Sequence, residues 1–214
     1  MKRVLALTLL LLVAAASTAE AQLCVGAPPF TQQPYQAGFG AAFRDGAQRV
    51  GGHIAAGGTS LFGGVGLSVV NYSDIDSTQT NINVFGGSEL SVEGDNRVFV
   101  CPLAAINFGV GPDIGPLSVS SFTLQGGGSV GFVASDRNDL MVVPTFGLAA
   151  AWQRTSFEVG NVESDDSDTF GVANLGVGLI FDRRIGITPG ISIPFSVGDS
   201  DVAFTIEFTF GFGR

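Results

Sequence analysis

His53 is the one histidine of the chain, and its ordinary pKa suits a general base near neutral pH. It lies among glycines, and Glu89 and Glu207 are the conceivable acidic partners. No serine occupies a nucleophile-type motif, and no Cys/His cluster has the spacing of metal ligands. A polar histidine hydrogen-bonded to its neighbours explains the residue without catalysis. The sequence therefore predicts no catalytic residue and no cofactor, and an enzyme centred on His53 is the weaker alternative.

A second group with possible chemistry is the acidic run Glu163-Ser-Asp-Asp-Ser-Asp168. Carboxylates that alternate with hydroxyls resemble the oxygen-rich content of a calcium site, and divalent ions also bridge acidic loops to anionic lipopolysaccharide. The candidate metal ligands are Glu163, Asp165, Asp166 and Asp168, and smaller acidic pairs occur at Asp74/Asp76 and Asp199/Asp201. Their spacing matches no defined calcium loop, so we favour solvated acidic loops without a metal.

The first 21 residues have the pattern of a secretory signal peptide. Lys2 and Arg3 are followed by an apolar run at 4–16, too short to span a membrane, and by the cleavage site Ala19-Glu-Ala21. We expect the mature chain to begin at Gln22. The whole chain has 10 basic and 19 acidic residues, and losing Lys2, Arg3 and Glu20 leaves 8 and 18. This acidic balance argues against nucleic acid as a partner.

Cys24 and Cys101 are the two cysteines of the chain. An exported protein reaches an oxidising compartment, so we predict one disulfide between them, with two buried free thiols as the alternative. Residues 22–34, which include Cys24, contain three prolines and no periodicity. We therefore predict an irregular N-terminal arm before the folded domain.

The rest of the chain alternates apolar and small or polar residues, as strands do. The pattern is clearest at the end, where Val202, Phe204, Ile206, Phe208, Phe210 and Phe212 share one face. The other face carries Thr, Gly and Glu207. The chain is 45% hydrophobic with a mean hydropathy of +0.39. No apolar run after residue 21 is long enough for a spanning helix, so the pattern indicates a closed membrane β-barrel with one face toward lipid. Two adjacent apolar faces at 185–195 and 202–212 disfavour a soluble ligand-binding barrel.

Turn residues divide residues 35–214 into ten predicted strands of an all-β, antiparallel, up-and-down transmembrane barrel, or eight if 35–58 is not two strands. We predict short turns at 44–47, 57–60, 93–96, 135–138 and 182–184, and longer loops at 71–80, 111–116, 156–168 and 198–201. When the last strand ends in the periplasm, four of the five turns fall on the periplasmic side, and all the longer loops fall on the extracellular side. Phe170 and Val172 have the wrong parity for their strand, which predicts either a bulge near 173–174 or inward aromatic packing.

The C-terminal strand resembles the terminal signature of small single-chain bacterial outer-membrane β-barrel proteins, although no subfamily motif is legible. In that resemblance Phe208, Phe210 and Phe212 would be read by the barrel-assembly machinery, with Gly213 and Arg214 as an extension. The resemblance implies the outer membrane of a Gram-negative envelope, with membrane lipids and lipopolysaccharide as neighbours. It implies no activity and no oligomeric state.

Parity also predicts what lies inside the barrel. We expect His53, Glu89, Arg97 and Glu207 to face the lumen among small residues. Cys101 has the inward parity of Arg97, so a bond to Cys24 would draw the arm into the lower lumen as a plug. The favoured function is a non-enzymatic barrel with a structural or surface-interaction role through its acidic extracellular loops. A narrow passive pore for small solutes is the alternative.

Overall fold

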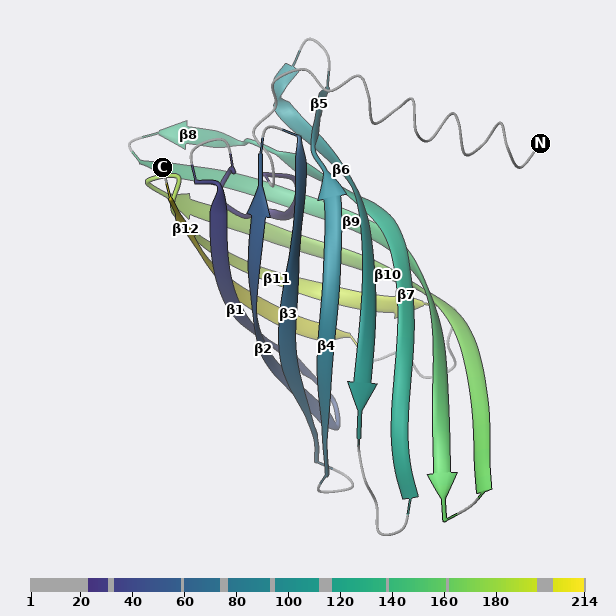
Figure 1. The fold of residues 1–214 in the computed structure, drawn as a ribbon. Coiled ribbons are helices and arrows are strands. Elements are labelled where there is room, and N and C mark those ends of the chain that lie inside the picture. The colour runs from purple at the N-terminus through teal and green to yellow at the C-terminus, as the bar shows by residue number, and fades with distance from the viewer. Residues whose placement is uncertain are drawn as a thin grey trace, which may run out of the picture.

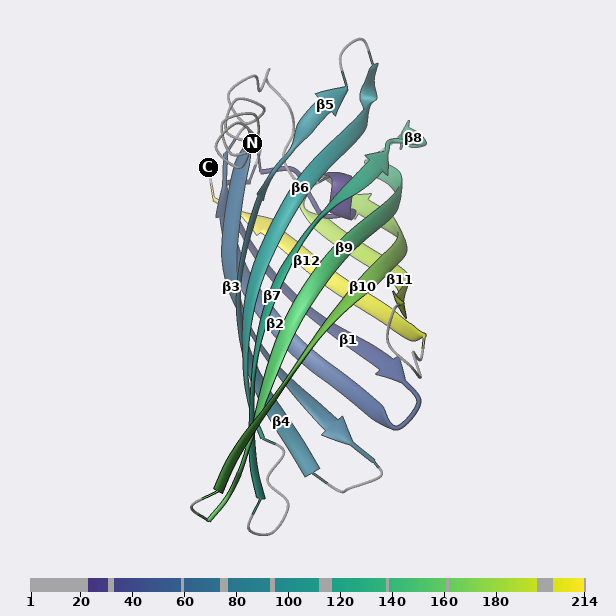
Figure 2. The same cartoon turned by 90° about the vertical axis from the view of Figure 1, so that its right-hand side faces the viewer.

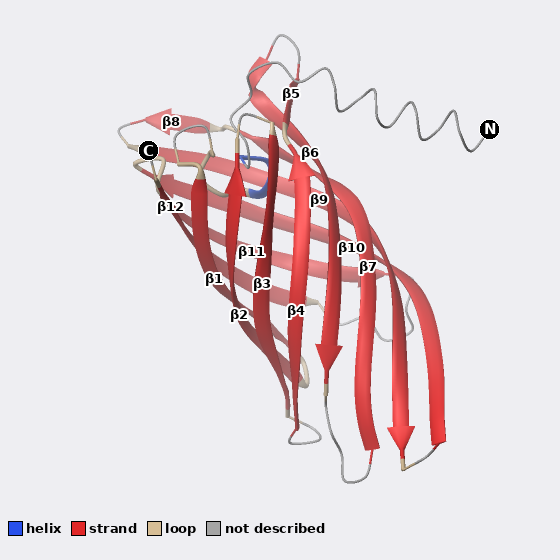
Figure 3. Cartoon of the chain, in the orientation of Figure 1, coloured by secondary structure: helices blue, strands red, loops and turns tan. Residues whose placement is uncertain are grey.

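Every long element among the residues that the computed structural model describes is a β-strand (Figures 1 and 3). It describes residues 23–30, 33–58, 60–73, 77–92, 95–111, 117–137, 139–160, 162–195 and 202–213. The expected signal peptide and the acidic residues Asp74, Asp76, Asp199 and Asp201 lie outside these ranges. No helix among the described residues is long and apolar enough to cross a membrane.

The strands form one closed antiparallel sheet. The long strands are β1 (Tyr35–Arg44), β2 (Ala47–Gly57), β3 (Leu61–Tyr72), β4 (Ser77–Ser88), β6 (Asp95–Val110), β7 (Leu117–Phe132), β9 (Leu140–Val159), β10 (Val162–Phe181), β11 (Ile185–Phe195) and β12 (Ala203–Phe212). Each pairs with its neighbours in chain order, and β12 pairs with β1 to close the ring. The described residues therefore form a ten-stranded barrel, and the division of 35–58 into two strands is confirmed.

Two additional short strands lie at the end of the barrel where β1 begins and β12 ends, here called the arm end. β5 (Leu90–Val92) pairs with β6, and β8 (Ser135–Arg137) pairs with β9. The expected turn at 135–138 is thus partly a strand. The turn at 182–184 is tight, and Asp182 and Arg183 adopt positive φ there. Part of the expected turn at 93–96 lies outside the described residues.

The opposite end, here called the hairpin end, is uneven. β7, β9 and β10 extend furthest from the arm end, as Figures 1 and 2 show. The expected loop at 156–168 was wrong, because β9 and β10 pair without interruption from Phe181↔Leu140 to Val162↔Val159. The loop expected at 71–80 is also shorter, since Tyr72 pairs with Ser77. The outward positions of both segments are polar, as at Asn71, Thr78, Ser156 and Asp165, so the lipid-facing apolar alternation stops there while backbone pairing continues.

The unbroken β9–β10 register also answers the parity question at Phe170. Phe170 pairs with Ala151 and Val172 with Ala149, in the same register as the rest of the strand. No bulge separates them from Leu175, so Phe170 and Val172 lie on the inner face. Inward packing is therefore the correct alternative.

The outer face of the barrel is apolar and carries aromatic rings at two levels. Ile54, Phe39 and Phe204 are 60%, 52% and 65% exposed. At the arm end the rings of Tyr35 and Phe212 stack 6.0 Å apart. Toward the hairpin end Phe122 contacts Phe108 at 5.1 Å and Trp152 at 6.0 Å. Two aromatic levels that flank an apolar band are characteristic of barrels that stand in a bilayer.

Candidate functional site

The N-terminal arm lies inside the barrel at its arm end, packed against the inner wall. It begins with a one-turn 3-10 helix, η1 (Leu23–Val25), which Figure 3 draws in blue within the ring of strands. Leu23, Cys24 and Phe30 are almost completely buried, and so are Pro28 and Pro29. Leu23, Cys24 and Phe30 belong to the hydrophobic core, to which the inner face contributes Phe62, Phe99, Met141, Val143 and Ile180. The main core of this protein is therefore the contact between arm and barrel wall.

A disulfide joins the arm to the wall. Cys24 is bonded to Cys101 of β6, with their Cα atoms 5.9 Å apart, and both residues are fully buried. The predicted pairing and the inward position of Cys101 are both found. Glu89, between β4 and β5, is also fully buried, and its Oε2 accepts a hydrogen bond from the Cys24 N–H at 3.2 Å. Glu89 therefore supports the start of the arm.

Glycines on the inner face make room for the arm. A Cβ at Gly178 of β10 would lie 2.5 Å from Gly26 Cα, and one at Gly131 of β7 would lie 2.5 Å from the Leu23 carbonyl oxygen. A Cβ at Gly57 of β2 would come within 2.5 Å of the Phe30 ring. The arm thus follows the inner wall past three separated strands, each of which lacks a side chain at the contact.

Two polar side chains of the wall also hold the arm backbone. Thr188 Oγ1 of β11 donates to the Gly26 carbonyl at 2.9 Å, and Gln36 Nε2 of β1 donates to the Pro28 carbonyl at 2.5 Å. Sequence reasoning missed these residues and the glycines. The available signal was their shared inward parity near the arm end, but parity alone does not show what a residue contacts.

On the hairpin-end side of the arm, His53 and Glu207 approach each other in the lumen. The two residues come from β2 and β12, on either side of β1, and His53 Nε2 lies 3.8 Å from Glu207 Oε1. The imidazole lies over Gly38 of β1, where any Cβ would overlap it, and its edge contacts the Phe85 ring at 5.6 Å between centroids. A separation of 3.8 Å is too long for a hydrogen bond, so this pair is not an aligned proton relay.

Arg97 lies apart from this pair. It is on β6 at the arm end, its side chain is exposed, and its carbonyl accepts a hydrogen bond from Val133 N–H at 2.7 Å. Of the four residues expected in the lumen, the structure brings His53 and Glu207 together. It places Glu89 next to the disulfide and Arg97 at the arm end of β6.

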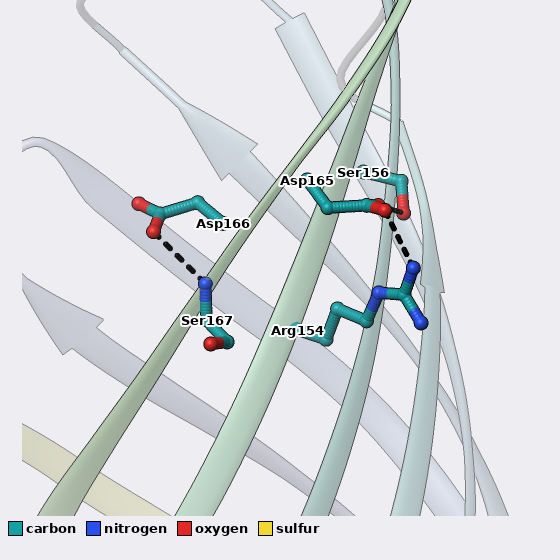
Figure 4. Close-up of polar contacts among 5 residues, drawn as sticks. All are labelled: Arg154, Ser156, Asp165, Asp166 and Ser167. Atoms are coloured by element: carbon teal, nitrogen blue, oxygen red, sulfur yellow. Dashed lines mark hydrogen bonds and ion pairs between the residues drawn. The ribbon is translucent and has the colours of Figure 1, made fainter.

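The acidic run of β10 does not form a single cluster. Asp165 accepts hydrogen bonds from Arg154 and Ser156, both at 2.5 Å, on one side of the strand. Figure 4 shows Asp166 on the other side, where it accepts the Ser167 N–H at 2.9 Å. Asp168 binds the Thr169 N–H in the same way at 2.7 Å. Because strand side chains alternate, Glu163 and Asp165 are separated from Asp166 and Asp168.

One group in the described part of the chain has three side chains of metal-ligand type close together, and it is Cys24, Glu89 and Cys101. Its two sulfurs are already joined in the disulfide and are not thiolates. The acidic candidates on β10 are not in such a group.

The phenylalanines expected to form the assembly signal lie along the closing seam of the barrel. The ring centroids of Phe208 and Phe210 lie 5.0 and 6.1 Å from that of Phe39 on β1, and the ring of Phe212 stacks on Tyr35. Cross-strand aromatic pairs of this kind stabilise a sheet by roughly 0.2–1 kcal/mol each. These residues therefore also stabilise the pairing of the first and last strands.

The fold and site define a class: a ten-stranded antiparallel β-barrel with an apolar outer face and an internal arm fixed by a disulfide. No protein-family model and no curated protein sequence matches the chain. Among solved structures it is similar to the N-terminal β-barrel domain of Pseudomonas aeruginosa OprF, at 12% identity over 84% of this chain and 98% of that one, with a TM-score of 0.41.

Two other solved barrels are similar at the same level. Ail of Yersinia pestis, in complex with the heparin analogue sucrose octasulfate, is 11% identical over 83% of this chain and 94% of that one, with a TM-score of 0.47. The translocator domain of NalP from Neisseria meningitidis is 12% identical over 83% and 87%, with a TM-score of 0.46. Such distant similarities concern the fold alone and assign no subfamily. The barrel itself rests on the strand pairing described above.

Proposed function

We propose that the protein is a non-enzymatic β-barrel of the bacterial outer membrane, closed on its periplasmic side by its own N-terminal arm. The apolar outer face and its two aromatic levels support a position in a bilayer. The arm end would face the periplasm and the hairpin end the exterior, after export and cleavage behind Ala21. Recognition of Phe208, Phe210 and Phe212 by the barrel-assembly machinery would complete insertion.

The observation that carries this proposal is the buried, disulfide-linked arm. Small residues dominate the inner wall, and an empty barrel of this size would leave a narrow path. The burial of residues 23–30 at the arm end supports closure of that path, with Leu23 and Phe30 1% and 2% exposed. A closed lumen favours a structural and surface role over a passive pore.

The β9–β10 hairpin supports a surface role. β11 pairs with β10 as far as Gly171, so residues 162–170 pair with β9 and extend beyond the end of β11. On the outer face the apolar band ends at Trp152, and Arg154 forms its ion pair with Asp165 two residues further on. Glu158 and Glu163 lie opposite each other near the tip. Like charges in opposite positions repel, which favours a bridging divalent cation to lipopolysaccharide.

Planar-bilayer conductance of the refolded protein tests the closed barrel. We expect no conductance from the oxidised protein and measurable conductance after reduction. Gly178→Ala should also conduct, because its Cβ would displace Gly26, whereas Gly126→Ala places a Cβ with no heavy atom within 4 Å and serves as the matched control. Steady conductance of the oxidised wild type would refute the closed barrel and favour the pore.

The lipopolysaccharide contact has its own test. Binding of the barrel to lipopolysaccharide-containing vesicles should increase with calcium, and Glu158→Gln with Glu163→Gln should reduce that increase. Calcium-independent binding that is equal in both proteins would exclude the cation bridge.

A further inference from the structure

The arm does not fill the whole lumen. Between the arm and the hairpin end remains a cavity of about 550 Å³. Cys24, Val25 and Ala27 of the arm line its arm-end side, and the inner faces of the strands form its wall. This volume lies within the range of roughly 300–1,000 Å³ typical of small-molecule sites. If the arm closes the periplasmic side, the cavity is a blind cup that a solute can enter only from the hairpin end.

Because glycine has no side chain, neighbouring side chains of the cup can lie directly against the backbone of its wall. His53 lies over Gly38, and a Cβ at Gly66 of β3 would overlap Asn83 Oδ1. A Cβ at Gly64 would lie 2.6 Å from the tip of the Phe85 ring. Large side chains at these glycines would simply have filled the barrel. Their absence leaves His53, Asn83 and Phe85 with open space in front of them.

The lining carries few charges and many neutral polar groups. Arg49 and Glu207 bring one charge of each sign, and Arg49 Nε already donates to Ser68 Oγ at 3.0 Å. Most of the other polar groups are amides and hydroxyls, which can both donate and accept: Asn83, Gln125, Asn174, Thr145, Thr188 and Thr205. Phe85, Leu103 and Ala105 add apolar surface.

We propose that this cup binds a small, net-neutral polyhydroxylated solute of the sugar type. Hydroxyls spaced around a ring match amides and hydroxyls that both donate and accept, and the C–H face of such a ring fits against Phe85. The half-exposed carboxylate of Glu207 is the strongest acceptor for a solute hydroxyl. This inference rests on the proposed closure by the arm.

The same lining disfavours charged ligands. Within the described lining, Glu207 is the one carboxylate, so a divalent cation would lack the several oxygen anions it prefers. An anion would have Arg49, whose charge is offset inside the same cavity by Glu207. A neutral solute leaves both charges compensated.

Isothermal titration of the oxidised, refolded protein tests the cup, in a detergent without sugar headgroups. Glucose and maltose are the neutral probes, and glucosamine and gluconate the charged ones. We expect saturable binding of a neutral probe at one site. Ala105→Phe, which fills the cavity, should abolish it, whereas Ile106→Phe on the outer face of the same strand should retain it.

Glu207→Gln should weaken binding about 10-fold, as expected for a lost charge-assisted hydrogen bond. Asn83→Ala should also weaken it, and this smaller change keeps the test informative if Ala105→Phe fails to fold. Absent saturation with both neutral probes, equal binding in Ala105→Phe, or tighter binding of a charged probe would each overturn the inference. Conductance distinguishes the two proposals. If the oxidised protein does not conduct and binds no sugar, closure by the arm stands and only the sugar site is refuted.

Discussion

Removal of the Cys24–Cys101 disulfide should change the arm from permanently docked to exchanging. The perturbation is Cys24→Ser with Cys101→Ser, or reduction of the wild type. Ordering residues 23–30 costs about 1–2 kcal/mol per residue, or roughly 8–16 kcal/mol in all. Without the bond, this cost must be offset by non-covalent contacts alone.

Those contacts are of similar size. Burial of Leu23 and Phe30 contributes roughly 3–6 kcal/mol. The hydrogen bonds of the Gly26 and Pro28 carbonyls contribute about 1 kcal/mol each, and that of Cys24 N–H to the Glu89 carboxylate about 2 kcal/mol. The total, roughly 7–10 kcal/mol, lies at the lower end of the ordering cost. The undocked arm should therefore be well populated once the bond is absent.

Amide hydrogen exchange of Cys24 and Gly26, whose N–H groups are hydrogen-bonded in the docked arm, measures this directly, with single-channel conductance as a second readout. The oxidised protein should protect these amides as strongly as β9, and the double serine variant should lose most of that protection while β9 keeps its own. Global unfolding should also become easier by up to about 4.5 kcal/mol, because the bond closes a loop of 77 residues. Unchanged protection of the arm in the serine variant would refute the balance drawn above.

Two further predictions concern the hairpin and the lumen. The hydrogen bonds from Arg154 and Ser156 hold the pKa of Asp165 below its ordinary value. Its contribution to hairpin stability is therefore complete above the ordinary aspartate pKa and is lost as pH falls through the lowered one. Amide exchange of the hairpin from pH 7 to 2 should show this, and Arg154→Gln should move the midpoint upward; an unmoved midpoint would contradict the pairing. In the lumen, Gly38→Ala should displace the imidazole, so the His53 Cε1–H NMR shift should no longer respond to Glu207→Gln. A response as large as in the Gly126→Ala control would show that the ring has not moved.

The strand alternation was readable without the fold because it is local. Lipid-facing and inward side chains alternate with period two, so the face of each residue can be predicted from its immediate neighbours in the sequence. That rule placed Cys101 inward, and the turn residues at 44–47 divided 35–58 into two strands. It failed at 156–168, where the outward positions of β9 and β10 are polar beyond the apolar band and the sequence suggested a loop.

Contacts across the barrel needed the tertiary structure. Parity showed that His53 and Glu207 face inward, but β1 lies between their strands and the strand register brings them to 3.8 Å. The same parity could not show that Gly57, Gly131 and Gly178 make room for the arm, because parity assigns a residue to a face and does not show what it contacts. The sequence by itself determined the alternating faces and the pairing of the two cysteines. Closure of the barrel decided what meets inside it, since lumen contacts join residues far apart in the chain.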